Sequence, residues 1–551
     1  MKTLSIKIMK GLPMKFSMFW RKSVSKSKRF LLREKQTVNS IKVAPFNPSL
    51  SRNIEELEEL LGGNIDFSTY QFTCFDRSIS LFFMRTLIDS ERLTRHIISP
   101  IQKTGLFLTS QGLSLSRNRE REGDELITLI QESCLPSSDT QRVENWQSAI
   151  EQILYGKALL LIDGETVGLS VGVKKENARN IDQPETEVSV IGPKESFVET
   201  LNTNIGLVRQ RLRDPYLRVD SVVVGKRTKQ EVTVLYLVDV ANPLIVNEVR
   251  RRLSCIETDG LISQMQLQEY LEDDSFSLFP QIRPTERPDV TCSYLLEGNV
   301  VVLAEGSAHA LLLPITFFQL LDTVDDYYTN WQYATLIRFV RLIALFFSII
   351  SPGLYLSLVA YNPELIPTRL LISMDAARVK VPFPILVEIF IMEVMIEILR
   401  EAGVKLPKPV GQAVSIVGGL VIGEAAVNAN LVSPVTVVIV ALTAISSFAA
   451  PVYYLGITYR ILRFFLLICS SIFGTYGLIL GLFLIHGHVA RLVSFGVPYL
   501  APFSPLRLQD WTDMLIRIPM KKLRTRPTFL KTIKKRKAGF FSMVHRDRNN
   551  R

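Results

Sequence analysis

The sequence contains few cysteines and few histidines, five of each in 551 residues, and neither type is arranged for chemistry. No two cysteines have CxxC spacing, so the sequence indicates neither a zinc motif nor a disulfide framework. His486 and His488 are two positions apart and would not share a helical face, which argues against a metal pair. We therefore expect no metal or other cofactor, and a reducing compartment for the soluble part.

Motifs of nucleotide-binding and catalytic sites are also missing. The chain has no P-loop, no Rossmann glycine fingerprint, no nucleophile elbow and no HExxH sequence. This absence predicts a protein that is not an enzyme. The segment before Arg21 contains lysines but no apolar core of signal-peptide length, so we expect the N-terminal domain to stay in the cytoplasm.

Charge and hydropathy divide the chain into a soluble part and a membrane part. Charged residues are frequent up to about residue 328, apolar runs dominate 329–510, and 511–551 is a basic tail that we expect in the cytoplasm. The net charge of +11 comes largely from the ends of the chain. Basic ends can contact nucleic acid, but beside membrane spans they more often mark the cytoplasmic side and anionic lipid. We expect membrane lipid as a partner and no nucleic acid.

The soluble part is predicted to be an α+β domain with two lobes. Residues 1–50 are typical of a flexible basic arm, 51–151 predict a first lobe, and 152–328 predict a second α+β lobe. Residues 158–171 contain two strand-like runs around an Asp163-Gly164 turn, which indicates a hairpin. The remaining strand-like and helical patterns predict a mixed sheet with helices.

Residues 329–510 predict a polytopic α-helical membrane domain, because about 20 apolar residues cross a bilayer core. The number of crossings is left open between six and four with re-entrant or interfacial pieces, since several runs are broken by charge or by proline and glycine. The candidate runs are 335–361, 383–398, 414–428, 435–454, 464–485 and 492–503.

Acidic residues inside the membrane part are the main candidates for an ion path. Glu393, Glu397 and Arg400 share one face of the amphipathic helix predicted at 383–402, and Glu424 lies in the next apolar run. Carboxylates within a membrane are costly and usually functional, and a ring of them from several subunits would attract cations. The alternative is a helix on the membrane surface in which Glu397 pairs with Arg400.

Other residues of the membrane part are expected to serve packing. Two pairs of glycines have the small-xxx-small spacing that lets helix backbones approach closely, namely Gly419 with Gly423 and Gly477 with Gly481. Glu388 lies nearly opposite Glu397 on its helix, so we expect it to contact another helix.

Two segments before the first apolar run are candidates for coupling the soluble part to the membrane. The first is the proline-punctuated connector 277–290, which ends in Arg287, Pro288 and Asp289. The second is DTVDDYY at 322–328. Neither segment has a catalytic pattern, and we interpret both as a joint or as subunit contacts. The candidate residues are Arg287, Pro288, Asp289, Asp325, Asp326 and Tyr327.

Three stretches resemble the A subunits of the GerA-type spore germination receptors. They are EILREAG at 397–403, LPKPVGQ at 406–412 and GGLVIGEAAV at 418–427, and the RPDV connector and VSFGVPYLAPF at 493–503 also match. This resemblance implies a multi-pass protein of the inner endospore membrane whose soluble domain faces the spore core. It also implies a complex with a permease-like B subunit that senses nutrient and a lipoprotein C subunit.

The same resemblance implies that A subunits associate in a ring whose membrane part forms a channel, opened by nutrient to release monovalent cations. Two alternatives remain from the residues. One is a secondary transporter that binds a coupling ion at Glu397 or Glu424, although the sequence shows no inverted repeat. The other is a membrane scaffold that conducts nothing.

Overall fold

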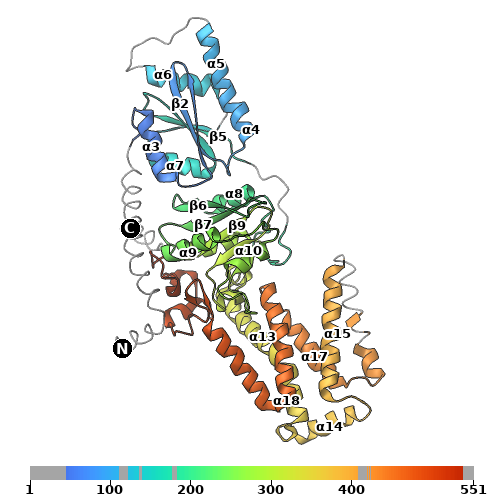
Figure 1. Ribbon diagram of the computed structural model, residues 1–551. Helices are drawn as coiled ribbons and strands as arrows, with labels where there is room; N and C mark the ends of the chain where they lie inside the picture. The colour runs from blue at the N-terminus through green and yellow to red at the C-terminus, as the bar shows by residue number, and fades with distance from the viewer. Residues whose placement is uncertain are drawn as a thin grey trace, which may run out of the picture.

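The computed structural model describes residues 45–110, 122–135, 139–175, 183–406, 418–419, 421, 423–514 and 516–537. In these residues two α+β lobes are stacked on one end of a helical bundle, as Figure 1 shows. The two-lobed α+β character predicted for the soluble part is therefore correct. Most of the predicted arm at 1–50 lies outside the described residues.

The first lobe is an antiparallel five-stranded sheet with helices on both faces. The strand order is β1-β2-β4-β5-β3. Alternate residues of β2 and β4 point to opposite faces, so Leu81 packs with Ile97 and Ile101, whereas Phe82 packs with Leu57 and Trp146. The strands are β1 (Phe67–Cys74), β2 (Arg77–Met84), β3 (Thr140–Val143), β4 (Lys157–Ile162) and β5 (Gly168–Gly172). The helices are α3 (Leu50–Leu61), α4 (Ser90–Leu93), α5 (Ser99–Ser110), α6 (Glu122–Leu129) and α7 (Trp146–Tyr155).

This sheet corrects the predicted boundary between the lobes at 151/152. The hairpin around Asp163 and Gly164 forms as β4 and β5, but it pairs with β2 and β3 of the first lobe. β4 is buried along its whole length, because it lies in the middle of the first sheet. The chain changes lobe after β5, in the segment that leads to α8.

The second lobe repeats the architecture with a sheet of order β6-β7-β9-β10-β8. α8 and α11 cover one face of the sheet, and α9 and α10 cover the other. The strands are β6 (Leu217–Val224), β7 (Gln230–Leu237), β8 (Arg283–Thr285), β9 (Val300–Ala304) and β10 (Ala310–Leu313). The helices are α8 (Leu201–Arg211), α9 (Pro243–Ser254), α10 (Gln264–Leu271) and α11 (Pro288–Glu297).

A buried ion pair joins the two lobes. Arg209 of α8 donates from Nε and Nη2 to the two carboxylate oxygens of Asp66, at 2.9 and 3.0 Å. Their side chains are 0% and 1% exposed. Next to the pair, the backbone N–H of Ile65 donates to the carbonyl of Val219 on β6 at 3.1 Å. Because the linkage is buried and bidentate, the lobes are held as one body.

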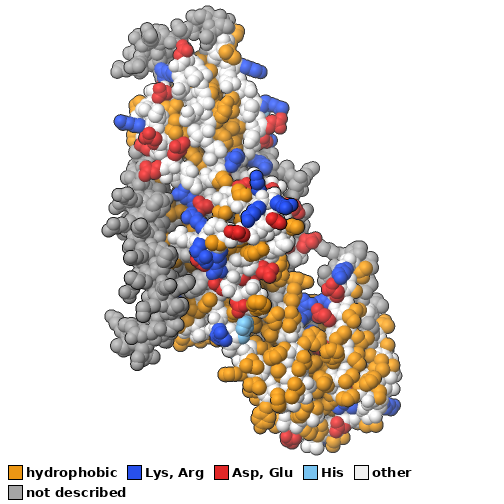
Figure 2. All heavy atoms as spheres, viewed as in Figure 1, with side chains coloured by type: hydrophobic (Ala, Val, Ile, Leu, Met, Phe, Trp, Pro, Cys, Tyr) orange, Lys and Arg blue, Asp and Glu red, His pale blue; other side chains and the backbone are white. Residues whose placement is uncertain are grey.

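The helical bundle follows the second lobe. α13 packs along α17 and α18, and Figure 2 shows hydrophobic side chains over most of the visible face of the bundle. Its helices are α13 (Trp331–Ala360), α14 (Thr368–Arg378), α15 (Ile385–Lys405), a helical segment within 418–428, α17 (Pro434–Ser447) and α18 (Tyr453–Arg491). Of the described helices, α13 and α18 are long and apolar enough to cross a membrane, with mean hydropathies of 2.1 and 2.0.

α18 is a hairpin of two helical arms that meet at Gly474. The backbone of Gly474 is non-helical, with φ 57° and ψ −136°, a conformation that glycine adopts readily. Leu466 and Leu478 belong to one hydrophobic cluster, and a Cβ at Gly481 would lie 2.7 Å from Leu466 Cδ2. In one straight helix Leu466 and Gly481 would be about 22 Å apart. The two arms therefore run antiparallel.

The apolar run at 492–503 is not a membrane helix. It contains a short antiparallel hairpin, β11 (Val493–Ser494) with β12 (Val497–Pro498), and packs against the second lobe. Tyr499 is fully buried there and its hydroxyl donates to the Pro280 carbonyl at 2.7 Å. Both alternatives predicted for this run, a crossing and a re-entrant piece, are wrong, because the second arm of α18 already brings the chain back to the lobe.

The described part of the C-terminal tail folds onto the second lobe. Phe529 and Leu530 are buried in the cluster that contains α9. The carbonyl of Leu530 accepts from the Asn242 side chain at 3.2 Å, and the N–H of Ile533 donates to the Val240 carbonyl at 3.0 Å. The tail and both lobes thus lie at the same end of the bundle.

Candidate functional site

Asp326 is the centre of the junction between the second lobe and the bundle. Its carboxylate is buried and accepts from Arg338 Nε at 3.0 Å and from Arg341 Nη1 and Nη2 at 3.1 Å each. Arg338 and Arg341 are three residues apart and therefore lie on one face of α13. Burial alone would raise the pKa of Asp326, but the hydrogen bond and charge of Arg341 and the charge of Arg338 lower it below its ordinary value. The two ion pairs of Asp326, with Arg338 and with Arg341, tie α12 (Asp325–Tyr328) to the first turns of α13.

Asp322 lies beside this pair in a less favourable environment. Its carboxylate is 3.1 Å from Arg338 Nη2. Burial outweighs the charge of Arg338 and raises the pKa of Asp322 to about 7. Asp513, whose carboxylate accepts from the Tyr327 hydroxyl at 3.4 Å, has its pKa raised to about 6 by burial. The junction therefore contains acids that titrate near neutral pH.

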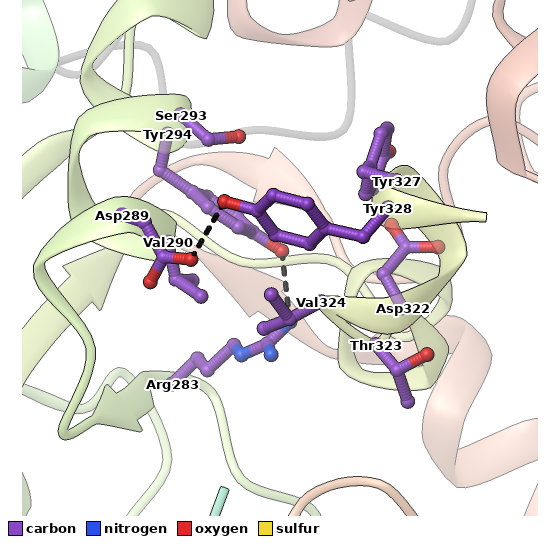
Figure 3. A pocket seen from close by; sticks show the side chains of 10 residues that line it. All are labelled: Arg283, Asp289, Val290, Ser293, Tyr294, Asp322, Thr323, Val324, Tyr327 and Tyr328. Atoms are coloured by element: carbon purple, nitrogen blue, oxygen red, sulfur yellow. Dashed lines mark hydrogen bonds between the residues drawn. The ribbon is translucent and has the colours of Figure 1, made fainter. Parts of the chain in front are cut away.

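The predicted coupling segment at 287–289 meets the junction directly. Pro288 is the first residue of α11, and Arg287 donates to both carboxylate oxygens of Asp289 at 3.0 Å. Arg287 Nη2 also donates to the Pro193 carbonyl at 2.7 Å, which holds the linker between the lobes. Figure 3 shows the Tyr328 hydroxyl bonded to Asp289, at 3.2 Å.

The structure thus brings together all six residues proposed for coupling. Asp325 accepts a hydrogen bond from Ser189, so the linker between the lobes touches α12 as well as α11. Sequence reasoning missed Arg283 and Asp322, which line the same junction. Both belong to segments that were predicted to couple the soluble part to the membrane, Asp322 to DTVDDYY and Arg283 to the connector 277–290. The partner of Arg283 could not be predicted, because Glu187 is 96 residues away in the chain.

The acidic face of α15 is paired with arginines of the same chain. The ion pair of Glu393 with Arg463 on α18 measures 2.9 Å, and these side chains are 1% and 2% exposed. Glu397 accepts from Arg400 at 3.4 Å and also pairs with Arg460 on α18. These carboxylates hold α15 against the first arm of α18.

Glu388 connects three elements at the other end of α15. It is fully buried and accepts from Arg378 Nη2, the Ser433 backbone N–H and the Thr436 hydroxyl, each at 3.0 Å. The contact with another helix expected for Glu388 is therefore made to the start of α17 and to α14. Arg400 makes a matching bond to Ser447 at the end of α17, at 3.0 Å, so α15 and α17 run in the same direction.

Glu424 lies on an exposed face of the segment within 418–428. In the part of the chain that the structure describes, it takes part in no ion pair. Asn428 is exposed one helical turn further on. Gly423 is in contact range of Val437 at 3.7 Å, measured from a Cβ built on the glycine, whereas a Cβ on Gly419 meets nothing within 4 Å. Glu424 and Asn428 thus place a carboxylate and an amide on the exposed side of this segment.

Gly477 and Gly481 lie where the two arms of α18 cross. A Cβ at Gly477 would overlap the carbonyl oxygen of Cys469.

Among the described residues no three histidine, cysteine, aspartate or glutamate side chains are grouped as metal ligands.

The comparisons with known proteins identify the family. The family model described as Bacillus/Clostridium GerA spore germination protein matches residues 55–529. The chain belongs to the GerA family. Its resemblance to germinant receptor A subunits is thereby confirmed.

Individual members of the GerA family are similar over most of their length. Spore germination protein GerLA of Bacillus cereus is 41% identical, over 89% of this chain and 97% of the relative. Spore germination protein KA of Bacillus subtilis is 36% identical, over 88% of this chain and 87% of the relative. One solved structure is also similar, a crystal structure of the N-terminal domain of the A subunit of the Bacillus megaterium spore germinant receptor GerK3. The two sequences are 26% identical, the match covers 50% of this chain and 98% of the solved chain, and the TM-score is 0.38.

Proposed function

We propose that this chain is the A subunit of a nutrient-responsive germinant receptor in the inner membrane of the endospore. It associates with a permease-like B subunit and a lipoprotein C subunit, and its bundles form a ring that conducts monovalent cations when nutrient binds. Membership of the GerA family supports the first part of this proposal. The course of the bundle and the position of Glu424 support the second.

The course of the chain supports a multi-pass membrane domain with both lobes and the tail on one side. α13 leads away from the second lobe, and its end at Tyr361 bonds to Ser471 beside the Gly474 turn. α15 leads back, the segment within 418–428 leads away, α17 leads back, and the two arms of α18 lead away and back. α17 spans about 21 Å, less than the roughly 30 Å of a bilayer core, so neighbouring helices must shield its ends.

The observation that carries the channel proposal is the exposed polar face with Glu424. An unpaired carboxylate facing lipid is unfavourable, so this face is expected to meet water or another subunit. In a ring, the same face of each copy would form a band of carboxylate and amide groups, which attracts cations. Glu393 and Glu397 then fasten α15 to α18 and do not line the ion path, which was one of the two alternatives expected for them; the other included the pairing of Glu397 with Arg400.

Potassium release from spores after nutrient addition tests this assignment. Spores would carry the unaltered chain, Glu424→Gln or Glu401→Gln at matched receptor levels. Glu401 is the control, because its carboxylate is exposed and pairs with Lys405 of its own helix, at 2.8 Å. We expect Glu424→Gln to slow release several-fold and Glu401→Gln to leave it unchanged. Normal release from Glu424→Gln spores would remove Glu424 from the ion path.

The pairing of Glu393 and Glu397 within one chain favours the second candidate, a scaffold that conducts nothing. The two functions differ in a reconstituted system. A channel subunit in potassium-loaded liposomes, purified with its partner subunits, releases potassium on nutrient addition, and a scaffold does not.

A further inference from the structure

The junction between the second lobe and the bundle contains a pocket of about 110 Å³. This volume holds several water molecules or one small organic solute. Figure 3 shows its position between α11 and α12, where the second lobe meets the bundle. The charged and aromatic residues that line it are Arg283, Asp289, Tyr294, Asp322, Tyr327 and Tyr328.

Asp322 is the group on this wall with the least satisfied hydrogen-bonding capacity. Its side chain is 15% exposed. Within the described residues its carboxylate accepts no hydrogen bond, and its contact with Arg338 is an ion pair without hydrogen-bond geometry. A carboxylate has about four acceptor sites, so Asp322 can accept from a donor in the pocket.

The other charged groups on the wall bond to protein partners, except that the buried Nε of Arg283 has no hydrogen-bond partner among the described residues. Arg283 donates to the Tyr294 hydroxyl at 3.0 Å, to the Gln319 carbonyl at 2.8 Å and to Glu187 at 3.2 Å. Asp289 accepts from Arg287 and from Tyr328. Of the two carboxylates on this wall, Asp322 is therefore the one with acceptor capacity left for a ligand, beside its ion pair with Arg338.

Tyr328 supplies an aromatic surface to the pocket that Asp322 also lines. In Figure 3 its ring extends across the pocket towards Asp289, which fixes its hydroxyl. Arg338 and Arg517 lie over the Tyr327 ring, at 5.7 and 4.8 Å from its centroid, and Arg283 lies near the Tyr294 ring at 5.6 Å. No cation lies over the Tyr328 ring among the described residues.

We propose that this pocket binds a small solute bearing a primary ammonium group, which donates to Asp322 and rests on the ring of Tyr328. A carboxylate combined with an open aromatic face is the arrangement that recognises ammonium groups. A divalent metal ion fits less well, because it requires six or more oxygen ligands or an ordered water shell. An anion would meet the carboxylates of Asp322 and Asp289.

Binding should depend on pH through Asp322. The pKa of this carboxyl is raised to about 7, and a bound ammonium would lower it. Binding near pH 7 therefore releases protons, and affinity should fall about tenfold between pH 8 and pH 6. The charged groups that act on Asp322 come from several elements, namely Arg283, Asp326, Arg338 and Asp513, and Asp322 also acts on Glu297 of α11.

Titration calorimetry on the full chain in detergent tests the proposal, with methylammonium as the probe and potassium chloride at the same ionic strength as the comparison. We expect saturable methylammonium binding at pH 8 that weakens at least tenfold in Asp322→Asn. Asp259→Asn is the matched control, since Asp259 is an exposed carboxylate of the same lobe. Absence of binding by the unaltered chain, or equal binding by Asp322→Asn, would overturn the proposal.

Tyr328 provides a second pair of variants that does not depend on the folding of Asp322→Asn. Tyr328→Phe keeps the ring and should retain binding, whereas Tyr328→Leu should weaken it several-fold. If potassium binds as tightly as methylammonium, the site is one for inorganic monocations and the ammonium assignment is wrong. If Asp322 takes up a proton but the chain does not bind methylammonium, the proposal is wrong, because a proton alone then neutralises this carboxylate.

Discussion

Removing Arg209 should loosen the connection between the two lobes. Arg209 and Asp66 are almost completely buried and share two hydrogen bonds at 2.9 and 3.0 Å. In Arg209→Met, Asp66 keeps the Thr86 hydroxyl, at 3.1 Å, as its one side-chain partner among the described residues. Leaving one charge of a buried pair without its partner costs about 3 to 5 kcal/mol. The equilibrium constant for opening the interface between the lobes should therefore increase by a factor of between about a hundred and several thousand.

Hydrogen exchange of the full chain in detergent measures this opening at defined amides. The N–H of Ile65 donates to the Val219 carbonyl, and the N–H of Val219 donates to the Asn64 side chain at 2.9 Å. Both bonds cross between the lobes, so their protection should fall in Arg209→Met. Arg227→Met is the control, because Arg227 is exposed and lies 3.8 Å from Asp259.

A double variant separates the charge effect from lost packing. Asp66→Leu with Arg209→Met removes both charges and should restore much of the protection, since apolar replacement of a buried pair is often neutral. Unchanged protection at Ile65 and Val219 in Arg209→Met would refute the reasoning. If the reasoning holds, the lobes move as one body, and a displacement of either lobe reaches α13 through the junction.

Three further predictions concern the bundle and the junction. Glu388→Ala should destabilise the contact between α15 and α17 by about 3 kcal/mol or more, because it leaves Arg378 and the start of α17 without their shared acceptor; thermal unfolding in detergent measures this loss. Gly477→Val should prevent the arms of α18 from packing, whereas Gly487→Ala, where a Cβ meets nothing within 4 Å, should be tolerated; receptor level in spore membranes reports both. Burial holds the pKa of Asp322 at about 7 against an ordinary 3.8, so the folded junction binds this proton more tightly than the unfolded chain, and its stability should fall as pH rises from about 4 to about 7. Exchange at 322–328 as a function of pH measures that loss.

Each of these predictions has a clear contrary outcome. Unfolding of Glu388→Ala at the same temperature as the unaltered chain would show that the three hydrogen bonds contribute nothing. Normal levels of Gly477→Val would contradict the crossing of the arms. An Asp322→Asn variant whose junction still loses stability between pH 4 and pH 7 would assign the effect to another acid.

Local patterns predicted many of the elements. The Asp163-Gly164 turn produced the β4–β5 hairpin, because turn residues between two apolar runs act over a few positions only. The sheet to which the hairpin belongs was not predicted, since strand pairing depends on contacts far apart in the chain. Likewise, the small-xxx-small spacing pointed to Gly477 as a packing position, but the reversal at Gly474 has no pattern in an apolar run.

The candidate site shows the same division. The acidic residues of α15 were evident from the sequence, because carboxylates in an apolar run are conspicuous. Their partners Arg460 and Arg463 lie on α18, more than 60 residues further along the chain, and were not predicted. Sequence spacing gives the face of a helix on which a residue lies, and it does not give the helix that covers that face.

The sequence by itself determined the family, the two-lobed α+β soluble part and the position of the apolar bundle, because motif, composition and periodicity are properties of adjacent residues. Only the tertiary structure decided which carboxylates are paired and which has no ion-pair partner among the described residues. It buried Glu393 and Glu388 among partners from other helices, left Glu424 exposed, and placed Asp322 and Tyr328 on the wall of one pocket at the junction. A charge is satisfied or unsatisfied according to the groups within a few ångströms of it, and folding brings those groups from distant parts of the chain.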